Sequence, residues 1–499
     1  MTVTSTSPDA ESAPRSPRAT FASYAPLPGT WDETFAGPGK VRGELERSLA
    51  ALVASRPEDL ARAQALAEKS LLNQGVTFSV YSDQRGSEKI FPFCLVPRVV
   101  TANDWKKVDK GLEQRIRALQ LFLDDVYGDQ KIFADKRIPA EVVLGAKHYL
   151  PELRGVRPPR GVRIHIAGID LVRDPGGVFR VLEDNLRTPS GVSYVMENRL
   201  VTKRVWPTIF AEARVRRVDH YPAKLAETLR AAAPEGSHDP CSVVLTPGPY
   251  NSAYFEHSFL ARTMGIELVQ GSDLVVEDDK VWLKTTRGLR RVHVVYRRID
   301  DAYLDPEFFR PDSLLGVPGI VRAWAKGNVT LANAPGNGVA DDKAVCALVP
   351  DVIRYYLGED PILEDVTTYL CARDDDRKYV LEHLGELVVK AVDEAGGYGM
   401  LMGPQSTAAE REEFARRIQA EPRKYVAQPR LELSTCPTWD GRGLVPRRVD
   451  LRPYILTSPD APWVLPGGLT RVALTEGSYV VNSSQGGGSK DTWVLQEGT

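Results

Sequence analysis

The hydrophobic periodicity of this chain changes near residue 155, and the change limits the folds that it can adopt. Up to about residue 150 the pattern is helical, and the clearest helix is predicted at 109–127, with Gly128 as its stop. Its apolar positions recur at three- and four-residue steps and are Leu112, Ile116, Leu119, Leu123 and Val126. Runs 162–171 and 177–182 then read as two strands joined by a hairpin turn at 174–177. A helical region followed by sheet predicts an α/β protein.

The length and composition indicate several ordinary globular units. A chain of 499 residues is too long for one hydrophobic core, and 42% hydrophobic with 26% charged residues is typical of globular proteins. Residues 1–39 are rich in Ser, Thr, Pro and Ala, so we expect a disordered tail whose end docks through Trp31 and Phe35. The pattern divides the rest into a helical region at 40–155, a strand-rich segment at 156–235, an inserted α/β lobe at 240–310 and a segment of alternating helices and strands at 311–499.

Charge and cysteine usage exclude several classes of protein. A net charge of −2 and a pI near 6.4 predict no nucleic-acid or membrane partner, and no apolar run approaches the roughly 18 residues of a membrane span. The seven histidines show no HxxH or HExxH spacing and there is no CxxC pair, so a zinc site is not expected. The odd, scattered set of cysteines fits reduced thiols in the cytoplasm. These are Cys94, Cys241, Cys346, Cys371 and Cys436.

Three oxygen-rich side chains end the second predicted strand. The sequence VLEDNLRTPSG runs from two apolar residues into Glu183, Asp184 and Asn185, and a Thr-Pro-Ser-Gly turn follows. A turn with a helix cap would explain this composition. A divalent-metal site would explain it as well, because Glu183 and Asn185, two positions apart, point to the same side of an extended chain. The segment alone does not decide between the two.

The usual nucleotide-binding signatures are missing, but one segment could bind phosphate in another way. GxxxxGK[ST], a GxGxxG after a strand and GxSxG do not occur, which argues against P-loop, dinucleotide-binding and serine-hydrolase chemistry. A predicted strand instead delivers Lys390 shortly before the turn Gly396-Gly397-Tyr398-Gly399. Glycines let backbone N–H groups approach phosphate oxygens, and a nearby ammonium offsets the charge. The alternative is a hairpin turn with an exposed lysine.

Three further segments carry polar groups in positions that need a physical reason. Lys343 opens a helix after an Asn/Gly-rich loop and an Asp cap, and alone this is a plain helix start. Gln428 ends a short strand and could read an adenine edge, although an ordinary core strand accounts for it equally. Arg471 lies inside an apolar strand, where a charge is costly unless it meets an anion or a structural carboxylate.

Taken together, these segments are similar to the circularly permuted ATP-grasp family, and more distantly to glutathionylspermidine synthetases. The resemblance covers about residues 76–495. The matching motifs are PRVV (97–100), GLEQRIRALQLFLDDVYG (111–128), VLEDNLRTPSGVSYVMENR (181–199), NGVADDKAV (337–345), VVKAVDEAGGYGML (389–401) and VNSSQGGGSKDTW (481–493). The resemblance implies an ATP-grasp core with an inserted Rossmann-like (pre-ATP-grasp) lobe and an N-terminal helical region. Segments 156–235 and 311–499 would form the two parts of that core.

The resemblance also implies a site and a reaction. ATP and Mg²⁺ would be the cofactors, since Mg²⁺ prefers hard oxygen ligands and phosphates. The expected residues are Asp170, Glu183 and Asn185 for the metal, Lys343, Lys390, Gly396, Gly397, Tyr398 and Gly399 for the nucleotide, Gln428 near the adenine, and Arg471 facing the triphosphate. The expected reaction joins a small-molecule or peptide carboxylate to an amine through an acyl phosphate. A homodimer formed through the helical region is compatible with the resemblance.

Some residues depart from the pattern of the synthetases. They carry an arginine two residues before the first metal aspartate, where this chain has Gly168, and Arg187 is a candidate to supply that charge. Ala391 and Glu394 alter the glycine-rich segment. Cys94 replaces an acidic residue and Pro429 follows Gln428 where Glu is common. The expected phosphate chemistry is retained, while the acceptor site is free to differ.

Three classes of function remain open from the sequence. The first is an ATP-dependent carboxylate–amine ligase that releases ADP and phosphate. The second is a phosphotransferase of the same fold that stops at phosphoryl transfer. The third is a catalytically quiet nucleotide-binding scaffold. The retained metal and lysine sets argue against the third, but ligase and kinase need the same charge-positioning groups.

Overall fold

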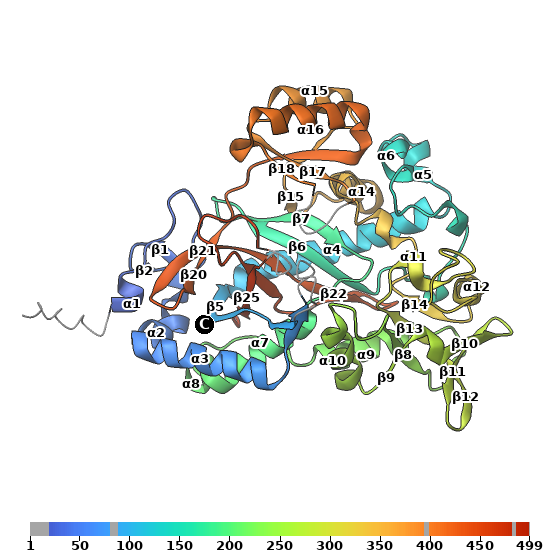
Figure 1. Ribbon diagram of the computed structural model, residues 1–499, viewed down its shortest axis with the longest axis horizontal. Helices are drawn as coiled ribbons and strands as arrows, with labels where there is room; N and C mark the ends of the chain where they lie inside the picture. Colours follow the sequence, from blue (N-terminus) through green and yellow to red (C-terminus); the bar gives the residue numbers. More distant parts are fainter. Residues whose placement is uncertain (1–18, 80–87, 394–398, 482–485, 499) are drawn as a thin grey trace, which may run out of the picture.

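A large sheet forms the centre of the molecule. The computed structural model describes residues 19–79, 88–393, 399–481 and 486–498 (Figure 1). Within these residues the central sheet has the strand order β15-β7-β6-β21-β24-β25-β5, with β20 beside β21 and β22 between β6 and β23. Its strands are β5 (Phe93–Val100), β6 (Ile166–Arg173), β7 (Phe179–Asn185), β15 (Glu364–Asp365), β20 (Thr435–Trp439), β21 (Leu444–Arg452), β22 (Tyr454–Thr457), β23 (Pro462–Val464), β24 (Leu469–Val472) and β25 (Gly488–Val494).

The predicted hairpin is formed by β6 and β7. All eight residues of β6 are buried, as expected for a strand covered on both faces. Asp174 builds the turn because its backbone N–H donates to Val178 and its carboxylate accepts the Val178 N–H at 2.9 Å. Gly177 takes φ +79°, which an L-residue rarely adopts. This confirms the prediction of two antiparallel strands joined at 174–177.

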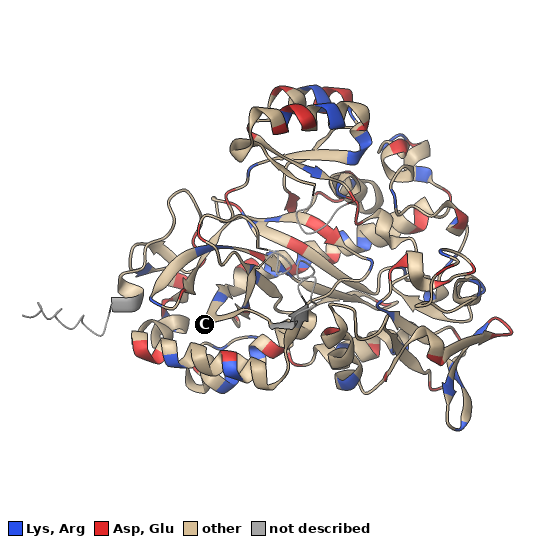
Figure 2. Ribbon diagram, in the orientation of Figure 1, with Lys and Arg blue, Asp and Glu red and all other residues tan. Residues whose placement is uncertain are grey.

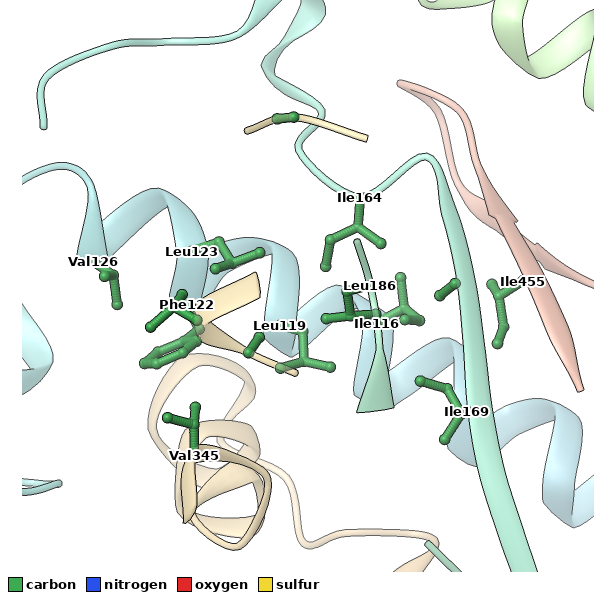
Figure 3. Close-up of a cluster of buried hydrophobic side chains, with 14 of the residues drawn as sticks. Ile116, Leu119, Phe122, Leu123, Val126, Ile164, Ile169, Leu186, Val345 and Ile455 are labelled. Atoms are coloured by element: carbon green, nitrogen blue, oxygen red, sulfur yellow. The ribbon is translucent and has the colours of Figure 1, made fainter. Parts of the chain in front are cut away.

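Helix α4 (Ala102–Val126) packs its apolar stripe near the central sheet. Thr101 caps it by accepting the N–H of Asp104 at 3.1 Å. Leu119, Phe122 and Leu123 are fully buried and lie in one core cluster with Ile164, Leu186 and other residues of the sheet and its loops (Figure 3). The helix predicted at 109–127 is therefore confirmed, and it begins seven residues earlier.

The other helices surround this core. The N-terminal part has α2 (Glu46–Val53), α3 (Pro57–Asn73), α5 (Lys131–Ala134) and α6 (Ala140–Leu144), with the short strands β3 (Thr77–Ser79) and β4 (Glu88–Ile90). The middle has α7 (Val192–Val205), α8 (Pro207–Glu212) and α9 (Tyr221–Ala231), followed further on by α11 (Asp301–Leu304), α12 (Ile320–Ala325), α13 (Lys343–Cys346) and α14 (Val349–Leu357). No helix in the described ranges is long and apolar enough to cross a membrane.

A small antiparallel lobe stands at the top of the view in Figure 1. Its sheet has the order β16-β19-β17-β18 and is covered by two helices. The elements are β16 (Tyr369–Leu370), α15 (Asp374–Glu382), β17 (Leu387–Ala391), β18 (Leu401–Met402), α16 (Ala408–Ala420) and β19 (Tyr425–Pro429). Lys, Arg, Asp and Glu alternate over α15 and α16 (Figure 2), so these helices present a charged surface.

The inserted α/β lobe contains a parallel sheet in the order β14-β13-β8-β9. Its elements are β8 (Ser242–Leu245), α10 (Tyr254–Met264), β9 (Glu267–Val269), β10 (Leu274–Glu277), β11 (Lys280–Thr285), β12 (Gly288–Val292), β13 (Val294–Arg297) and β14 (Thr330–Ala332). Two details differ from the sequence-based expectation. The sheet continues to β14, beyond residue 310. In addition, the run 288–297 forms two strands separated at His293 rather than one, because β12 pairs with β11 whereas β13 joins the parallel sheet.

The segment before residue 40 packs onto the body from residue 19 onward. It contains α1 (Ala19–Ala22), β1 (Phe35–Gly37) and, just after it, β2 (Lys40–Val41). Glu33 is fully buried and pairs with Arg98 at 2.5 Å and with Arg173 at 2.9 Å. The guanidinium groups of Arg42 and Arg173 both contact the Trp31 ring. The ordered body therefore includes residues that the tail prediction for 1–39 left out, and residues 1–18 lie outside the described ranges.

Candidate functional site

One face of the central sheet gathers charged side chains from four neighbouring strands. Asp170 on β6 is opposite Glu183 on β7, and Gly168 is opposite Asn185. On the other side of β6, the pairing of Leu451 with Leu171 places Arg452 opposite Asp170. Residues directly opposite in antiparallel strands share a face. The three predicted metal ligands therefore lie on one face, as the two-residue period required.

Two arginines hold the carboxylate of Asp170. Arg452 donates through Nε to Oδ1 at 2.5 Å and through Nη2 to Oδ2 at 2.7 Å, and Nη2 of Arg471 donates to Oδ2 at 2.7 Å. Burial alone would raise the pKa of Asp170, but the two guanidinium charges outweigh it and hold the pKa well below its usual range. Arg471 also forms a close ion pair with its cross-strand neighbour Asp450. The partners of the buried arginine are thus carboxylates, the second of the two alternatives that the sequence allowed.

The other two predicted metal ligands are less constrained. Burial, followed by the charge of Asp170, raises the pKa of Glu183. The Nδ2 atom of Asn185 is buried and has no hydrogen-bond partner among the described residues. A buried amide without a partner is costly in a stable core. An Nδ2 donor without a partner fits a bound acceptor such as a phosphate oxygen, while the Oδ1 atom of Asn185 and the two carboxylates form an oxygen-rich set that suits Mg²⁺.

A metal site made of His, Cys, Asp and Glu alone is not found: the described residues contain no cluster of three or more such side chains that could hold a metal ion. The set at β6 and β7 has two carboxylates, and its third member is the amide of Asn185. A magnesium site of this kind relies on few protein ligands because phosphates and waters supply the rest. The donor set therefore fits a metal that arrives with a nucleotide.

The two predicted lysines approach the same place from the small lobe and from α13. Burial lowers the pKa of Lys390 to about 8; among its charged neighbours, Glu183 raises it and Lys343 lowers it further. The backbone N–H of Lys343 donates to Val392 at 3.2 Å, which ties the start of α13 to the end of β17. Asp342 caps α13 as predicted, accepting the N–H groups of Ala344 and Val345. Lys343, Lys390 and Glu183 therefore act on one another electrostatically.

A cavity of about 270 Å³ lies between the small lobe and the central sheet. Its lining includes Val388 and Lys390 from β17, Met402 from β18, Gln428 from β19, Leu182 from β7 and Asp450 from β21. Lys390 donates to Oε1 of Gln428 at 2.7 Å, and Nε2 of Gln428 donates to Thr368 at 2.9 Å. The side chain of Gln428 is thus engaged, and the chain that follows it lines the cavity with Pro429, Arg430 and Leu431 as it leaves the sheet.

The remaining candidates are Arg187 and the glycine turn 396–399. Arg187 pairs with Asp341 at 2.9 Å and with Asp300 at 2.7 Å, so it links three loops. Gly399 has φ +64°, a conformation that favours glycine. Gly396, Gly397 and Tyr398 lie outside the described residues. The catalytic role of Arg187 and the phosphate role of the glycine turn stay predictions.

Comparison with known proteins identifies the fold. A family profile described as circularly permuted ATP-grasp type 2 matches residues 97–473. The chain belongs to the circularly permuted ATP-grasp family. Over 469 residues it is 55% identical to an uncharacterized protein of Synechocystis, covering 94% of this chain and 98% of that protein. An uncharacterized Mycobacterium tuberculosis protein is 54% identical over 466 residues, covering 93% and 84% respectively.

Two more distant relatives carry names that concern ligases. A Frankia alni protein, provisionally named a glutamate–cysteine ligase, is 43% identical over 471 residues, but the match spans 94% of this chain and only 54% of that longer protein. The solved structure of a glutathione synthetase-like effector from Globodera pallida has a TM-score of 0.59 at 10% identity, covering 88% of this chain and 98% of that one. This structural likeness shows the ATP-grasp fold alone.

Sequence reasoning missed Arg452 and Asp450, which bond to Asp170 and Arg471 in this cluster. The signal was present, because the run 449–456 is apolar apart from Asp450 and Arg452, which alternate on one face. This is the same pattern of charge in a buried strand that drew attention to Arg471. Their partners could not be named, since Asp170 and Arg452 are separated by 282 positions in the chain.

Proposed function

We propose that this protein is an ATP-dependent ligase that joins a carboxylate to an amine and releases ADP and phosphate. One observation carries the proposal. Lys390 lines the cavity between the small lobe and the central sheet, and it interacts electrostatically with Lys343 and with Glu183, the cross-strand neighbour of Asp170 in the predicted metal set. Carboxylates for a metal opposite ammonium groups for phosphate are the parts that phosphoryl transfer from ATP requires.

Each group has a role that its surroundings support. Asp170, Glu183 and Asn185 would hold Mg²⁺, which supplies positive charge to the phosphate oxygens when bound. Lys390 would contact phosphate with an ammonium that burial has partly stripped of water. The apolar walls from Leu182, Val388 and Met402 suit a planar base, and the backbone after Pro429 would read its edge.

The proposed reaction has two steps. A carboxylate oxygen of the first substrate attacks the γ-phosphorus, the bond to the ADP oxygen breaks, and an acyl phosphate forms. The amine nitrogen of the second substrate then attacks the acyl carbon, loses a proton and expels phosphate. The protein would contribute position and charge rather than a covalent intermediate of its own. All five cysteines are free thiols, which supports our proposal that the enzyme works in the cytoplasm.

Hydroxylamine distinguishes a ligase from a kinase. We expect a pool of amino acids and small carboxylates, incubated with ATP and Mg²⁺, to give ADP, phosphate and a hydroxamate when hydroxylamine replaces the amine. Glu183→Gln is the matched negative control, because it removes one metal ligand in place. A stable phosphorylated product with ADP would favour the kinase. AMP and pyrophosphate would contradict the proposal, since they indicate adenylation.

A further inference from the structure

The Arg452 side chain packs beside Gly168 on the face of the sheet that carries the predicted metal ligands. It is the last residue of β21, next to β6. A Cβ atom added to Gly168 would lie 3.3 Å from Cδ and 3.5 Å from Cγ of Arg452, and 3.1 Å from Cβ of Pro189. Most real Cβ contacts are wider than this, so any larger residue at 168 would crowd the arginine. The missing side chain at Gly168 therefore leaves room for the Arg452 side chain, which bonds to Asp170.

The partners of Arg452 differ from those of Arg471. Arg471 has a second carboxylate, Asp450, to which both Nε and Nη2 donate. Arg452 donates two hydrogen bonds to Asp170, and its next carboxylate oxygen is that of Glu183 at 3.9 Å. The side chain is 14% exposed and Asp170 is fully buried. Arg471 thus keeps the hydrogen bonds to Asp450 if Asp170 turns away, whereas Arg452 is left with the longer contact to Glu183.

We infer that Arg452 exchanges partners during the proposed reaction. In the nucleotide-free protein it holds Asp170, and when metal and nucleotide are bound it releases Asp170 and contacts the transferring phosphoryl group. The inference rests on the proposed function. The two oxygens of Asp170 accept three arginine hydrogen bonds, so the guanidinium groups occupy most of the lone pairs that a metal ion would use and compete with it for this carboxylate.

The chemistry favours Arg452 as the group that withdraws and phosphate as its new partner. A guanidinium leaving Asp170 needs another anion nearby, because an unpaired charge in a part-buried site is costly. Its planar fork matches phosphate oxygens as well as carboxylate oxygens. A cation that meets the phosphoryl group in this way stabilises the charge of the transition state. Arg452 would then supply the positive charge that the synthetases place at the position of Gly168.

This exchange predicts opposite effects on metal binding and on turnover. Replacing Arg452 removes a competitor for Asp170, so divalent metal should bind more tightly. The same replacement removes a charge from the reacting phosphoryl group, so turnover should fall. A purely structural brace would give a different result, because losing it would misplace Asp170 and weaken metal binding and turnover together.

The test measures Mn²⁺ binding to the nucleotide-free protein by titration calorimetry, and ATP turnover with Mg²⁺ in parallel. For Arg452→Gln we expect Mn²⁺ affinity to rise about 10-fold and turnover to fall about 100-fold, with Arg452→Lys regaining part of the turnover. Gly168→Ala crowds the arginine without removing it and should shift both quantities in the same directions by less. Arg447→Gln is the matched control, because Arg447 lies on β21 but donates to the Leu474 carbonyl.

The outcomes separate this inference from the function it rests on. Mn²⁺ affinity and turnover that fall together in Arg452→Gln, or that both equal the wild-type values, would overturn the partner exchange. Wild-type protein that binds neither Mn²⁺ nor ATP would overturn the proposed function instead. Unfolding curves of each variant identify loss of the fold, and Gly168→Ala keeps the arginine charge should Arg452→Gln fail to fold.

Discussion

Replacing Lys390 by Met should make the nucleotide-free protein more stable while removing its ATP site. Burial lowers the pKa of Lys390 from 10.5 to about 8, so the folded protein disfavours the charged amine. Below pH 8 the lysine is charged in both states, and the folded state carries the whole penalty. Between pH 8 and 10.5 the unfolded chain binds more protons, so wild-type stability should rise with pH in this window.

The size of the effect follows from these values. A pKa lowered from 10.5 to about 8 corresponds to about 3 kcal/mol at neutral pH. Solvent reaches part of the side chain, which reduces this value, and Lys390→Met also loses the hydrogen bond to Gln428, worth about 1 kcal/mol. We therefore expect Lys390→Met to raise the unfolding free energy by about 1–2 kcal/mol at pH 7.

Urea unfolding at pH 7 and pH 10 measures both parts of this prediction. The gain of Lys390→Met over wild type should shrink at pH 10, and ATP with Mg²⁺ should no longer stabilise the variant. Lys378→Met is the matched control, since Lys378 lies on α15 of the same lobe, away from the cavity, and should change stability by less than about 0.5 kcal/mol. A destabilised Lys390→Met, or a gain that is equal at both pH values, would refute the reasoning.

Three further predictions concern the metal set, the nucleotide and a buried histidine. Glu183→Gln should lower turnover about 100-fold because it removes a charged metal ligand. The unfolding temperature should not change, because burial already disfavours the charged form of Glu183. Turnover equal to that of the wild type would favour the interpretation of this segment as a turn with a helix cap. ATP with Mg²⁺ at about 100 times its dissociation constant should add about 2.7 kcal/mol to the unfolding free energy, and no shift at millimolar levels would contradict the nucleotide site. Burial lowers the pKa of His165 to about 3, so the unfolded chain binds its proton first and stability should fall by about 2.5 kcal/mol from pH 7 to pH 4.5. His165→Phe should flatten that fall in urea titrations, and an unchanged slope would count against it.

Local patterns predicted most of the elements around the site. The three- and four-residue steps of 109–127 are sufficient for α4, because an apolar stripe with this spacing is typical of a long amphipathic helix. The two-residue period places Glu183 and Asn185 on one face without any knowledge of the fold. The Asp cap at 342 fixes the start of α13 for the same local reason.

Pairings between distant strands could not be predicted in this way. Nothing near Arg452 indicates that β21 would lie beside β6, since that neighbour is chosen by the packing of the whole sheet. The extension of the inserted lobe to β14 has the same origin, because a three-residue buried strand carries too little pattern to assign. Arg187 was a reasonable candidate from its position next to the metal set, but its ion pairs with Asp300 and Asp341 depend on loops more than 100 residues away.

The burial of Glu33 between Arg98 and Arg173 bears on the order in which the chain assembles during synthesis. The neighbouring Asp32 accepts a hydrogen bond from Thr435, which lies 403 positions later. At ribosomal rates of about 5–20 residues per second, Thr435 is synthesised roughly 20–80 seconds after this early segment. The segment around Asp32 is therefore synthesised early but completes its contacts late. The partners of the Glu33 carboxylate, Arg98 and Arg173, are made early, whereas the contacts of Asp32 and of the Glu33 N–H with Thr435 form after strand β20 has left the ribosome.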